Sequence, residues 1–306
     1  MRIGIHSFSA RPTLKQQLQQ VTDADRDGFD SYWFGQAFGL DALTVAALAG
    51  ENTSRIELGT AVAVTYSRHP FAMALQALTV QAATDGRFTL GIGPSHKPLI
   101  QDMWGLPYEQ VAGHVREYLS VLRPLVDEGR VAFSGAQYRV AGALQMPDAR
   151  PCPILISALA PMMLRIAGEL ADGTVTWMAG PKTVETHIVP RISAAAEAAG
   201  RPKPRVCVSL PVAVAEDVAE ARQRAARAFQ IYGHLPNYRR MLDREGATGP
   251  EDVAIVGNEA EVERQLRALA GTGCTDLIAS VFPAQEDAAA SVARTWGLLK
   301  SLVGKL

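Results

Sequence analysis

The amino-acid sequence predicts one (β/α)8 barrel. Two observations lead to this prediction: short β-rich runs alternate with helical patterns almost from end to end of the 306 residues, and those runs number eight. Most of the runs are continuously apolar, which is typical of parallel strands buried on both faces. A strand followed by a helix, repeated about eight times, favours a closed barrel. The hydrophobic fraction of 48% is ample for such a core.

The expected strands are short segments in which apolar and β-branched residues gather. Helical patterns or turn residues fill the gaps between them. In chain order the strands are Ile3–His6, Ser31–Phe34, Ile56–Val62, Phe88–Ile92, Ile154–Ser157, Thr174–Trp177, Val206–Val214 and Asp276–Ser280.

Helix start signals stand in several of the gaps. Thr13 and Gln16 have the spacing of a capping box, in which each side chain bonds the backbone N–H of the other residue. Pro70 and Pro161 fit the first position of a helix, where a missing N–H costs nothing. Asn258 is the expected cap of a late helix. These signals support the strand–helix alternation independently of the strands.

Two connections are longer than a simple barrel needs. Residues 94–153, after the fourth strand, include a predicted helix over Tyr108–Asp127 and the hairpin-like run "VAFSGAQYRV". Residues 215–257, after the seventh strand, include a predicted helix around Asp217–Tyr232. Long insertions with structure of their own are usually functional, so we expect both near the barrel mouth. No linker divides the chain, and residues 1–306 are expected to form a single domain.

Composition excludes several classes of function. The net charge is −1 and no run of five basic residues occurs, which argues against nucleic-acid binding. No apolar run approaches the roughly 18 residues of a membrane helix, and the N-terminus turns polar at His6, too early for a signal peptide. Cys152, Cys207 and Cys274 lie far apart, outside any CxxC pattern. We interpret them as reduced thiols of a cytoplasmic protein without a metal site.

The run "RFTLGIGPSHKP" marks a candidate site. In a (β/α)8 barrel, catalytic residues lie at the C-terminal ends of the strands, and this run is the end of the fourth strand with the loop that leaves it. Gly91 and Gly93 leave room for a flat or large group to approach the backbone, and Ser95 and His96 follow at once. The strand ends "TAVAVTYSRHP", "SALAP" and "TWMAG" have the same character.

These motifs resemble a known family. The segments "LGTAVAVTYSRHP", "LTVQAATDGRFTLGIGPSHKP", "REYLSVLRPL", "LAPMMLRIAGELADGTVTWMAG" and "VGNEAEVERQL" are similar to the bacterial-luciferase-like flavin oxidoreductases. Within that family the sequence is most similar to the branch that uses the deazaflavin coenzyme F420. The resemblance runs from about Arg2 to Pro283. It implies a (β/α)8 barrel with the deazaflavin across its C-terminal mouth.

The resemblance also implies cofactor contacts. The family often holds a non-proline cis peptide behind the ring, and the matching bond here joins Ala61 and Val62. Gly93 and Ser95, at the end of the fourth strand, are assigned to the same site. The implied phosphate contacts are backbone N–H groups at a helix start, contributed by Ala158, Leu159 and Ala160. The residues implied near the ring are Trp177 and Met178. A glycine is more usual where Ala160 stands.

Two departures from the family pattern bear on the reaction. Sugar-phosphate dehydrogenases of the family carry an Asp-His pair where this chain has Gln36 and Ala37, so hydroxyl oxidation by that histidine is disfavoured. The acid of some relatives aligns with His96, whose imidazole titrates near neutrality and is our candidate proton donor. Gln36 is a candidate for ring or substrate contact, with a structural amide as the alternative. His6 is an outside candidate for substrate contact, and His69 is expected to shape the turn before Pro70.

Three functions are weighed. The first is an F420-dependent oxidoreductase that transfers a hydride between the cofactor and a small organic substrate, more in the direction of reduction. The second is a two-component monooxygenase that uses FMN, and the third is a non-catalytic ligand-binding barrel. Arg68, Lys97 and Lys182 are interpreted as surface charges, of which one or two could clamp the acidic cofactor tail. The resemblance implies a homodimer.

Overall fold

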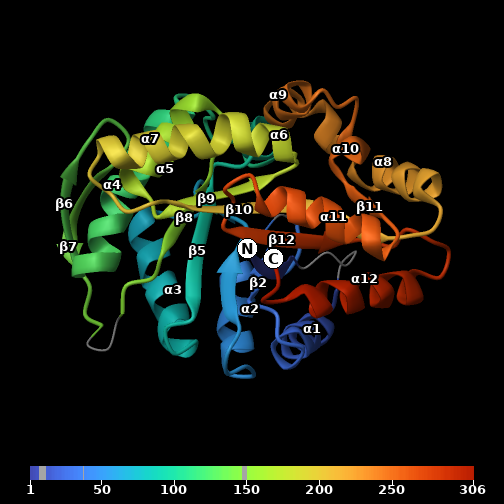
Figure 1. Ribbon diagram of the computed structural model, residues 1–306. Helices are drawn as coiled ribbons and strands as arrows, with labels where there is room; N and C mark the ends of the chain where they lie inside the picture. The colour runs from blue at the N-terminus through green and yellow to red at the C-terminus, as the bar shows by residue number, and fades with distance from the viewer. Residues whose placement is uncertain (7–11, 37, 147–149) are drawn as a thin grey trace.

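The computed structural model describes residues 1–6, 12–36, 38–146 and 150–306. Within these residues, eight parallel strands form a closed barrel with helices around it (Figure 1). The strands pair in the order β9–β10–β12–β1–β2–β3–β5–β8, and β8 pairs with β9 to close the ring. The predicted fold class is therefore confirmed. The barrel strands are β1 (Arg2–His6), β2 (Ser31–Phe34), β3 (Glu57–Thr60), β5 (Phe88–Gly93), β8 (Ile154–Ser157), β9 (Gly173–Trp177), β10 (Arg205–Val214) and β12 (Asp276–Val281).

The third barrel strand is interrupted, unlike the continuous run Ile56–Val62 that we predicted. Strand β3 ends at Thr60 and pairs with the start of β5, and the short β4 (Ala63–Val64) pairs with the end of β5. Between them the Ala61–Val62 peptide bond is cis, as the family resemblance implied. A further short strand, β11 (Ile255–Gly257), pairs with β10 and was not predicted.

Helices cover the outside of the barrel. Thr13 and Gln16 form both halves of the predicted capping box, and Asn258 caps its helix through the N–H of Glu261. His69 accepts the N–H of Phe71, so it shapes the helix start as predicted. The helices are α1 (Leu14–Arg26), α2 (Ala42–Gly50), α3 (Pro70–Ala83), α4 (Val111–Glu128), α5 (Pro161–Leu170), α6 (Pro181–Thr183), α7 (Val189–Ala198), α8 (Val218–His234), α9 (Pro236–Glu245), α10 (Pro250–Val253), α11 (Glu259–Ala270) and α12 (Ala288–Leu302).

The two insertions are folded segments. The first contains the π-helix η1 (Pro98–Met103), α4 and the antiparallel hairpin of β6 (Arg130–Ser134) and β7 (Arg139–Ala143). The hairpin confirms the prediction from "VAFSGAQYRV", whereas α4 begins three residues later than predicted, at Val111. The second insertion forms α8, α9 and α10, which gather beside one end of the barrel in Figure 1.

The barrel interior is layered because side chains alternate along each strand. At the N-terminal end of the strands, Arg205 donates to the carboxylates of Glu57 and Asp276, both at 2.6 Å. Above this charged layer lies an apolar one. Its buried members are Trp33, Leu155, Val175, Cys207 and Ile278.

Three further observations concern the cysteines, metal ligands and the length of the helices. Cys152, Cys207 and Cys274 are buried and free. The described residues contain no cluster of three or more histidine, cysteine or acidic side chains that could hold a metal ion. In the same part of the chain, no helix has the length and apolarity that crossing a bilayer requires.

Candidate active site

The C-terminal mouth of the barrel has a floor made of small and polar residues. Five of its residues lie two positions beyond a member of the apolar layer, and the other three lie two positions beyond Gly4, Gly59 and Gly91, so all eight face the same interior. We call this third layer the floor; it consists of His6, Gly35, Ala61, Gly93, Ser157, Trp177, Ser209 and Ser280.

Glycines keep the floor flat. A Cβ at Gly93 would overlap Ser157 Oγ and would lie 2.7 Å from Val62 Cγ2. A Cβ at Gly35 would lie 3.1 Å from the Nε2 atom of His6. The space beside Gly93 is already filled by the side chains of Ser157 and Val62, and Gly93 is buried, whereas the backbone of Gly35 is exposed at the floor. This observation gives a physical reason for the glycines of the "LGIG" run.

Several polar atoms of the floor are buried without a partner. Among the described residues, neither ring nitrogen of His6 has a hydrogen-bond partner, and the same holds for Trp177 Nε1 and Ser280 Oγ. A buried polar group without a partner destabilises the folded protein, so such a cluster is typical of a ligand site. Burial lowers the pKa of His6 to about 4, and its imidazole is therefore neutral at pH 7. A neutral imidazole offers one donor and one acceptor.

An aromatic wall rises from the floor. The ring of Trp177 lies 5.5 Å from Tyr232 of α8, which lies 5.2 Å from Tyr238 of α9. Tyr238 in turn lies 5.4 Å from His96. On the other side, the rings of Trp177 and His6 are 6.2 Å apart. One series of rings thus connects the histidine on the floor with the histidine on the loop after β5.

His96 sits on a loop that other residues hold in place. Ser95 has a positive φ of 58°, and its carbonyl accepts a 2.7 Å hydrogen bond from the Tyr108 hydroxyl. The carbonyl of His96 accepts from the N–H groups of Leu99 and Ile100, which open η1. Burial lowers the pKa of His96 from its usual value. The imidazole is therefore largely neutral at pH 7, as it is for His6.

The loop before α5 offers free N–H groups. Ala160 caps α5 without a side-chain hydrogen bond, and Pro161 has no N–H. The N–H of Ala158 donates to Thr174 Oγ1 at 3.2 Å, so one of the three expected donors is engaged inside the protein. No partner appears within the described chain for the N–H groups of Leu159 and Ala160, which face an uncapped helix start.

His187 holds this loop through a hydrogen bond, and the sequence analysis did not predict this residue. Its Nε2 donates to the Leu159 carbonyl at 2.7 Å, so the proton lies on Nε2 because a carbonyl only accepts. His187 is buried in the π-helix η2 (Val184–Ile188). A lone histidine between Thr186 and Ile188 gives no sequence signal for this contact.

Gln36 is part of a polar cluster at the rim. Its Nε2 donates to Asp41 Oδ2 and its Oε1 accepts from Arg68, both at 3.1 Å. Arg68 also pairs with Asp41, and its side chain is only 15% exposed. The interpretation of Arg68 as a surface charge was therefore wrong, because Asp41 neutralises it in a half-buried place. Lys97 and Lys182 are exposed, and Ala37 lies outside the described residues.

The two residues predicted near the ring from β9 differ in placement. The side chain of Trp177 belongs to the floor and the wall. Met178 has a positive φ of 56°, and its side chain is fully buried in the main hydrophobic cluster. Only Trp177 therefore presents a side chain to the mouth. The cis bond between Ala61 and Val62 lies beside the floor, packed against the apolar layer.

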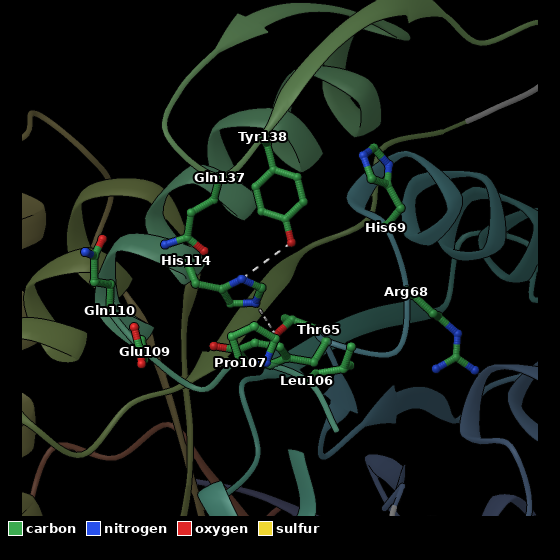
Figure 2. Close-up of a pocket in the computed structure, with 11 residues that line it drawn as sticks. Thr65, Arg68, His69, Leu106, Pro107, Glu109, Gln110, His114, Gln137 and Tyr138 are labelled. Carbon is green, nitrogen blue, oxygen red and sulfur yellow. Dashed lines mark hydrogen bonds between the residues drawn. The ribbon is translucent and has the colours of Figure 1, made fainter. Parts of the chain in front are cut away.

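A side pocket of about 550 Å3 opens next to the floor (Figure 2). Its wall includes Thr65, whose N–H donates to the carbonyl of the floor residue Gly93 at 3.0 Å. Figure 2 shows His114 between Thr65 and Tyr138, with hydrogen bonds to both. The pocket was not predicted, because its residues come from three separate segments of the chain.

The fold is a (β/α)8 barrel, and enzymes with this fold carry their active sites at the C-terminal mouth. The family described as luciferase-like monooxygenase matches residues 1–276. The chain belongs to this family.

Several relatives resemble the chain over most of its length. A 5,10-methylenetetrahydromethanopterin reductase of Methanolobus tindarius is 29% identical over 287 residues, which cover 92% of this chain and 86% of the relative. The coenzyme F420-dependent tetrahydromethanopterin reductase of Methanopyrus kandleri has a similar structure, with a TM-score of 0.81 and 21% identity over 100% of this chain and 98% of that one. The oxygenating constituent of 3,6-diketocamphane monooxygenase from Pseudomonas putida, in complex with FMN, has a TM-score of 0.78 at 19% identity, covering 100% and 97%.

Proposed function

We propose that the protein is a coenzyme F420-dependent oxidoreductase that reduces a small organic substrate. The observation that carries the proposal is the floor, where the backbone of Gly35 is exposed and, among the described residues, buried polar atoms of His6, Trp177 and Ser280 lack partners. A flat ring bound there would cover the exposed backbone of Gly35. The 29% identical relative, a methylenetetrahydromethanopterin reductase, and the F420-dependent reductase of similar structure support the choice of cofactor.

The residues present fit a cofactor that has a flat ring and a phosphate. Ala61, Val62, Gly93 and Ser95 would hold the ring, beside the wall residue Trp177. The N–H groups of Leu159 and Ala160, at the uncapped start of α5, would hold the phosphate. When bound, a reduced deazaflavin supplies a hydride. The protein supplies orientation, a mouth closed by aromatic rings, and a proton.

His96 is the proposed proton donor. Its imidazole lies at the end of the aromatic wall, where a substrate on the floor would be enclosed. Only the protonated imidazole is an effective acid near neutrality, and burial lowers its pKa below 6.5. We therefore expect the turnover rate for reduction to fall as pH rises above the pKa of His96. Replacing His96 by glutamine should remove this pH dependence while leaving cofactor binding unchanged.

Gln36 and its neighbour in sequence, Ala37, support reduction as the direction of the proposed reaction. Its amide is held at both ends by Asp41 and Arg68, and an amide does not titrate. Sugar-phosphate dehydrogenases of the family have a histidine base where this chain has Ala37. The adjacent Gln36 does not supply a titratable group in its place. Reduction is favoured over hydroxyl oxidation on this ground.

The decisive experiment is a fluorescence-quench titration of the purified protein with oxidised coenzyme F420, in parallel with FMN. We expect micromolar or tighter binding of F420 and much weaker binding of FMN. The reverse order would support an FMN-dependent two-component monooxygenase, for which the same phosphate loop would serve. Binding of neither cofactor would support a non-catalytic ligand-binding barrel and would refute the proposal.

We also propose that the protein works in the cytoplasm as a homodimer. Three free and buried cysteines agree with a reducing compartment. Light scattering coupled to size-exclusion chromatography tests the dimer, and a mass of about 33 kDa, one chain, would contradict it.

A further inference from the structure

The side pocket joins three segments that are far apart in the sequence. The loop after β4 contributes Thr65, Tyr66, Arg68 and His69, the segment before α4 contributes residues 106–107 and 109–110, and the hairpin tip contributes Gln137 and Tyr138. His114 of α4 is also part of the lining. The Glu117 carboxylate fixes the hairpin tip, because it accepts the N–H groups of residues 136, 137 and 138 at 2.8–3.0 Å. The pocket of about 550 Å3 is therefore built by ordered elements (Figure 2).

His114 is a buried polar residue of the pocket lining. Its Nε2 lies 2.9 Å from Thr65 Oγ1, and its Nδ1 lies 3.4 Å from the Tyr138 hydroxyl. Its ring stacks on Tyr66 with centroids 4.0 Å apart and planes at 15°. The residue is 3% exposed, and burial lowers its pKa to about 4. The imidazole is neutral at pH 7, and both hydroxyl partners can either donate or accept.

Tyr66 connects the pocket with the active site. Its hydroxyl is buried and has no partner among the residues that the structure describes. Its ring lies 5.5 Å from Tyr108, whose hydroxyl holds the carbonyl of Ser95, next to His96. A buried phenol without a partner destabilises the folded protein unless a ligand satisfies it. The Tyr66 hydroxyl therefore indicates a ligand that reaches past the active-site loop.

The charges around the pocket argue against an anionic ligand. Asp41 neutralises the Arg68 guanidinium, and Gln36 also accepts from it. His69 uses its Nδ1 to accept the N–H of Phe71, and Glu109 adds an exposed carboxylate. The remaining polar groups are hydroxyls and the amides of residues 110 and 137. A neutral ligand with both donors and acceptors matches this lining, whereas a carboxylate or phosphate would find no free cation.

We propose that the side pocket binds a neutral planar group that bears a carboxamide or a similar donor–acceptor pair, and that this group is the non-reacting end of the organic substrate. The aromatic side chains of Tyr66 and Tyr138 in the pocket lining suit the planar part, and the Tyr66 hydroxyl suits the amide. The assignment to the substrate rests on the proposed function, because the reacting end would lie over the floor. The assignment of the pocket to a neutral ligand does not.

The test uses benzamide and benzoate, which share a ring and differ in charge. Ligand-observed NMR titrations at pH 7 with the full chain should show millimolar binding of benzamide and at least tenfold weaker binding of benzoate. Tyr66→Phe, which deletes only the partnerless hydroxyl, should weaken benzamide binding at least fivefold. His114→Phe should do the same, and His234→Phe, an exposed histidine outside the pocket, should have no effect.

The result that overturns the proposal is equal or tighter binding of benzoate, unchanged benzamide binding in Tyr66→Phe, or binding of neither probe. His114→Phe loses two hydrogen bonds and could unfold, so Tyr66→Phe decides. The F420 titration on Tyr66→Phe separates this proposal from the proposed function. Selective benzamide binding without F420 binding would support the pocket proposal and contradict the proposed function. F420 binding without selective benzamide binding would support the proposed function and contradict the pocket proposal.

Discussion

The two ends of the barrel interior treat polar groups in opposite ways. At the N-terminal end, Arg205 satisfies both Glu57 and Asp276, and its guanidinium lies 5.5 Å from the Trp33 ring. Burial alone would raise the pKa of each of these carboxyl groups, but Arg205 holds both below their usual values. At the C-terminal end, His6 and Trp177 carry buried polar atoms that have no described partner. The same scaffold is completed for stability at one end and left open for binding at the other.

Breaking the charged end should produce the largest effect. Arg205→Met would leave Glu57 and Asp276 buried without a cation, and we expect a loss of about 3–5 kcal/mol in the free energy of unfolding. Urea denaturation measures it. The control is Arg264→Met, which removes an exposed pair with Glu261 and should leave the midpoint nearly unchanged. Equal midpoints for both variants would show that the charged layer is not structural.

Filling the open end should remove cofactor binding. Gly93→Ala places a Cβ against Ser157 Oγ and Val62 Cγ2, so these side chains or the backbone of the floor must shift. We expect F420 affinity to fall about a hundredfold, or about 2.7 kcal/mol. Gly297→Ala on α12, where nothing lies within 4 Å, is the matched control. Unchanged affinity in Gly93→Ala would place the ring elsewhere.

Removing a partnerless group should separate activity from stability. His6→Leu deletes an imidazole that makes no described hydrogen bond, so the urea midpoint should stay equal or rise. Turnover with F420 should fall about tenfold to a hundredfold if His6 contacts the substrate. A lower midpoint together with normal turnover would instead make His6 a structural residue of the barrel.

Mild acid should destabilise the protein through its buried histidines. The pKa of His114 is about 4 in the folded state against 6.5 for the free group, so the unfolded chain binds the proton first as pH falls. Between pH 6.5 and 5 we expect the free energy of unfolding to drop by about 1–2 kcal/mol for this residue.

The carboxyl groups with lowered pKa values, such as Glu57 and Asp276, lose their contribution only nearer pH 4. The window from pH 6.5 to 5 therefore belongs to the histidines. The free energy of unfolding, measured by urea denaturation at several pH values in this window, should fall less steeply with decreasing pH in a folded His114→Phe variant. An unchanged slope would show that His114 is not buried in the neutral form.

The sequence predicted the backbone of the fold better than its side-chain partners. Short β-rich runs marked all eight barrel strands, and most of these runs are continuously apolar because burial on both faces constrains every residue. Gly93 was predicted as a site residue because a glycine at the end of a buried strand indicates a place where a side chain would not fit. Arg205 and Glu57 pair across 148 residues, and no local pattern announces such a contact.

The side-chain contacts in the walls of the site could not be predicted from local sequence patterns either. Helix α9 was not predicted, although Tyr238 within it lies against both Tyr232 and His96. Tyr66 and His114 stack across 48 residues, and each alone resembles an ordinary core residue. Partners of this kind depend on how two insertions pack, which a periodicity does not encode.

The second insertion leaves and re-enters the barrel at one point. The N–H of Ala215 donates to the carbonyl of Gly257 at 2.8 Å, so the segment between them begins and ends at neighbouring atoms. A segment closed in this way can change in length or sequence at little entropic cost to the rest of the chain. It also carries the tyrosines of the aromatic wall. Descent with modification can therefore exchange the wall, and the choice of substrate with it, while the barrel and its floor are inherited intact.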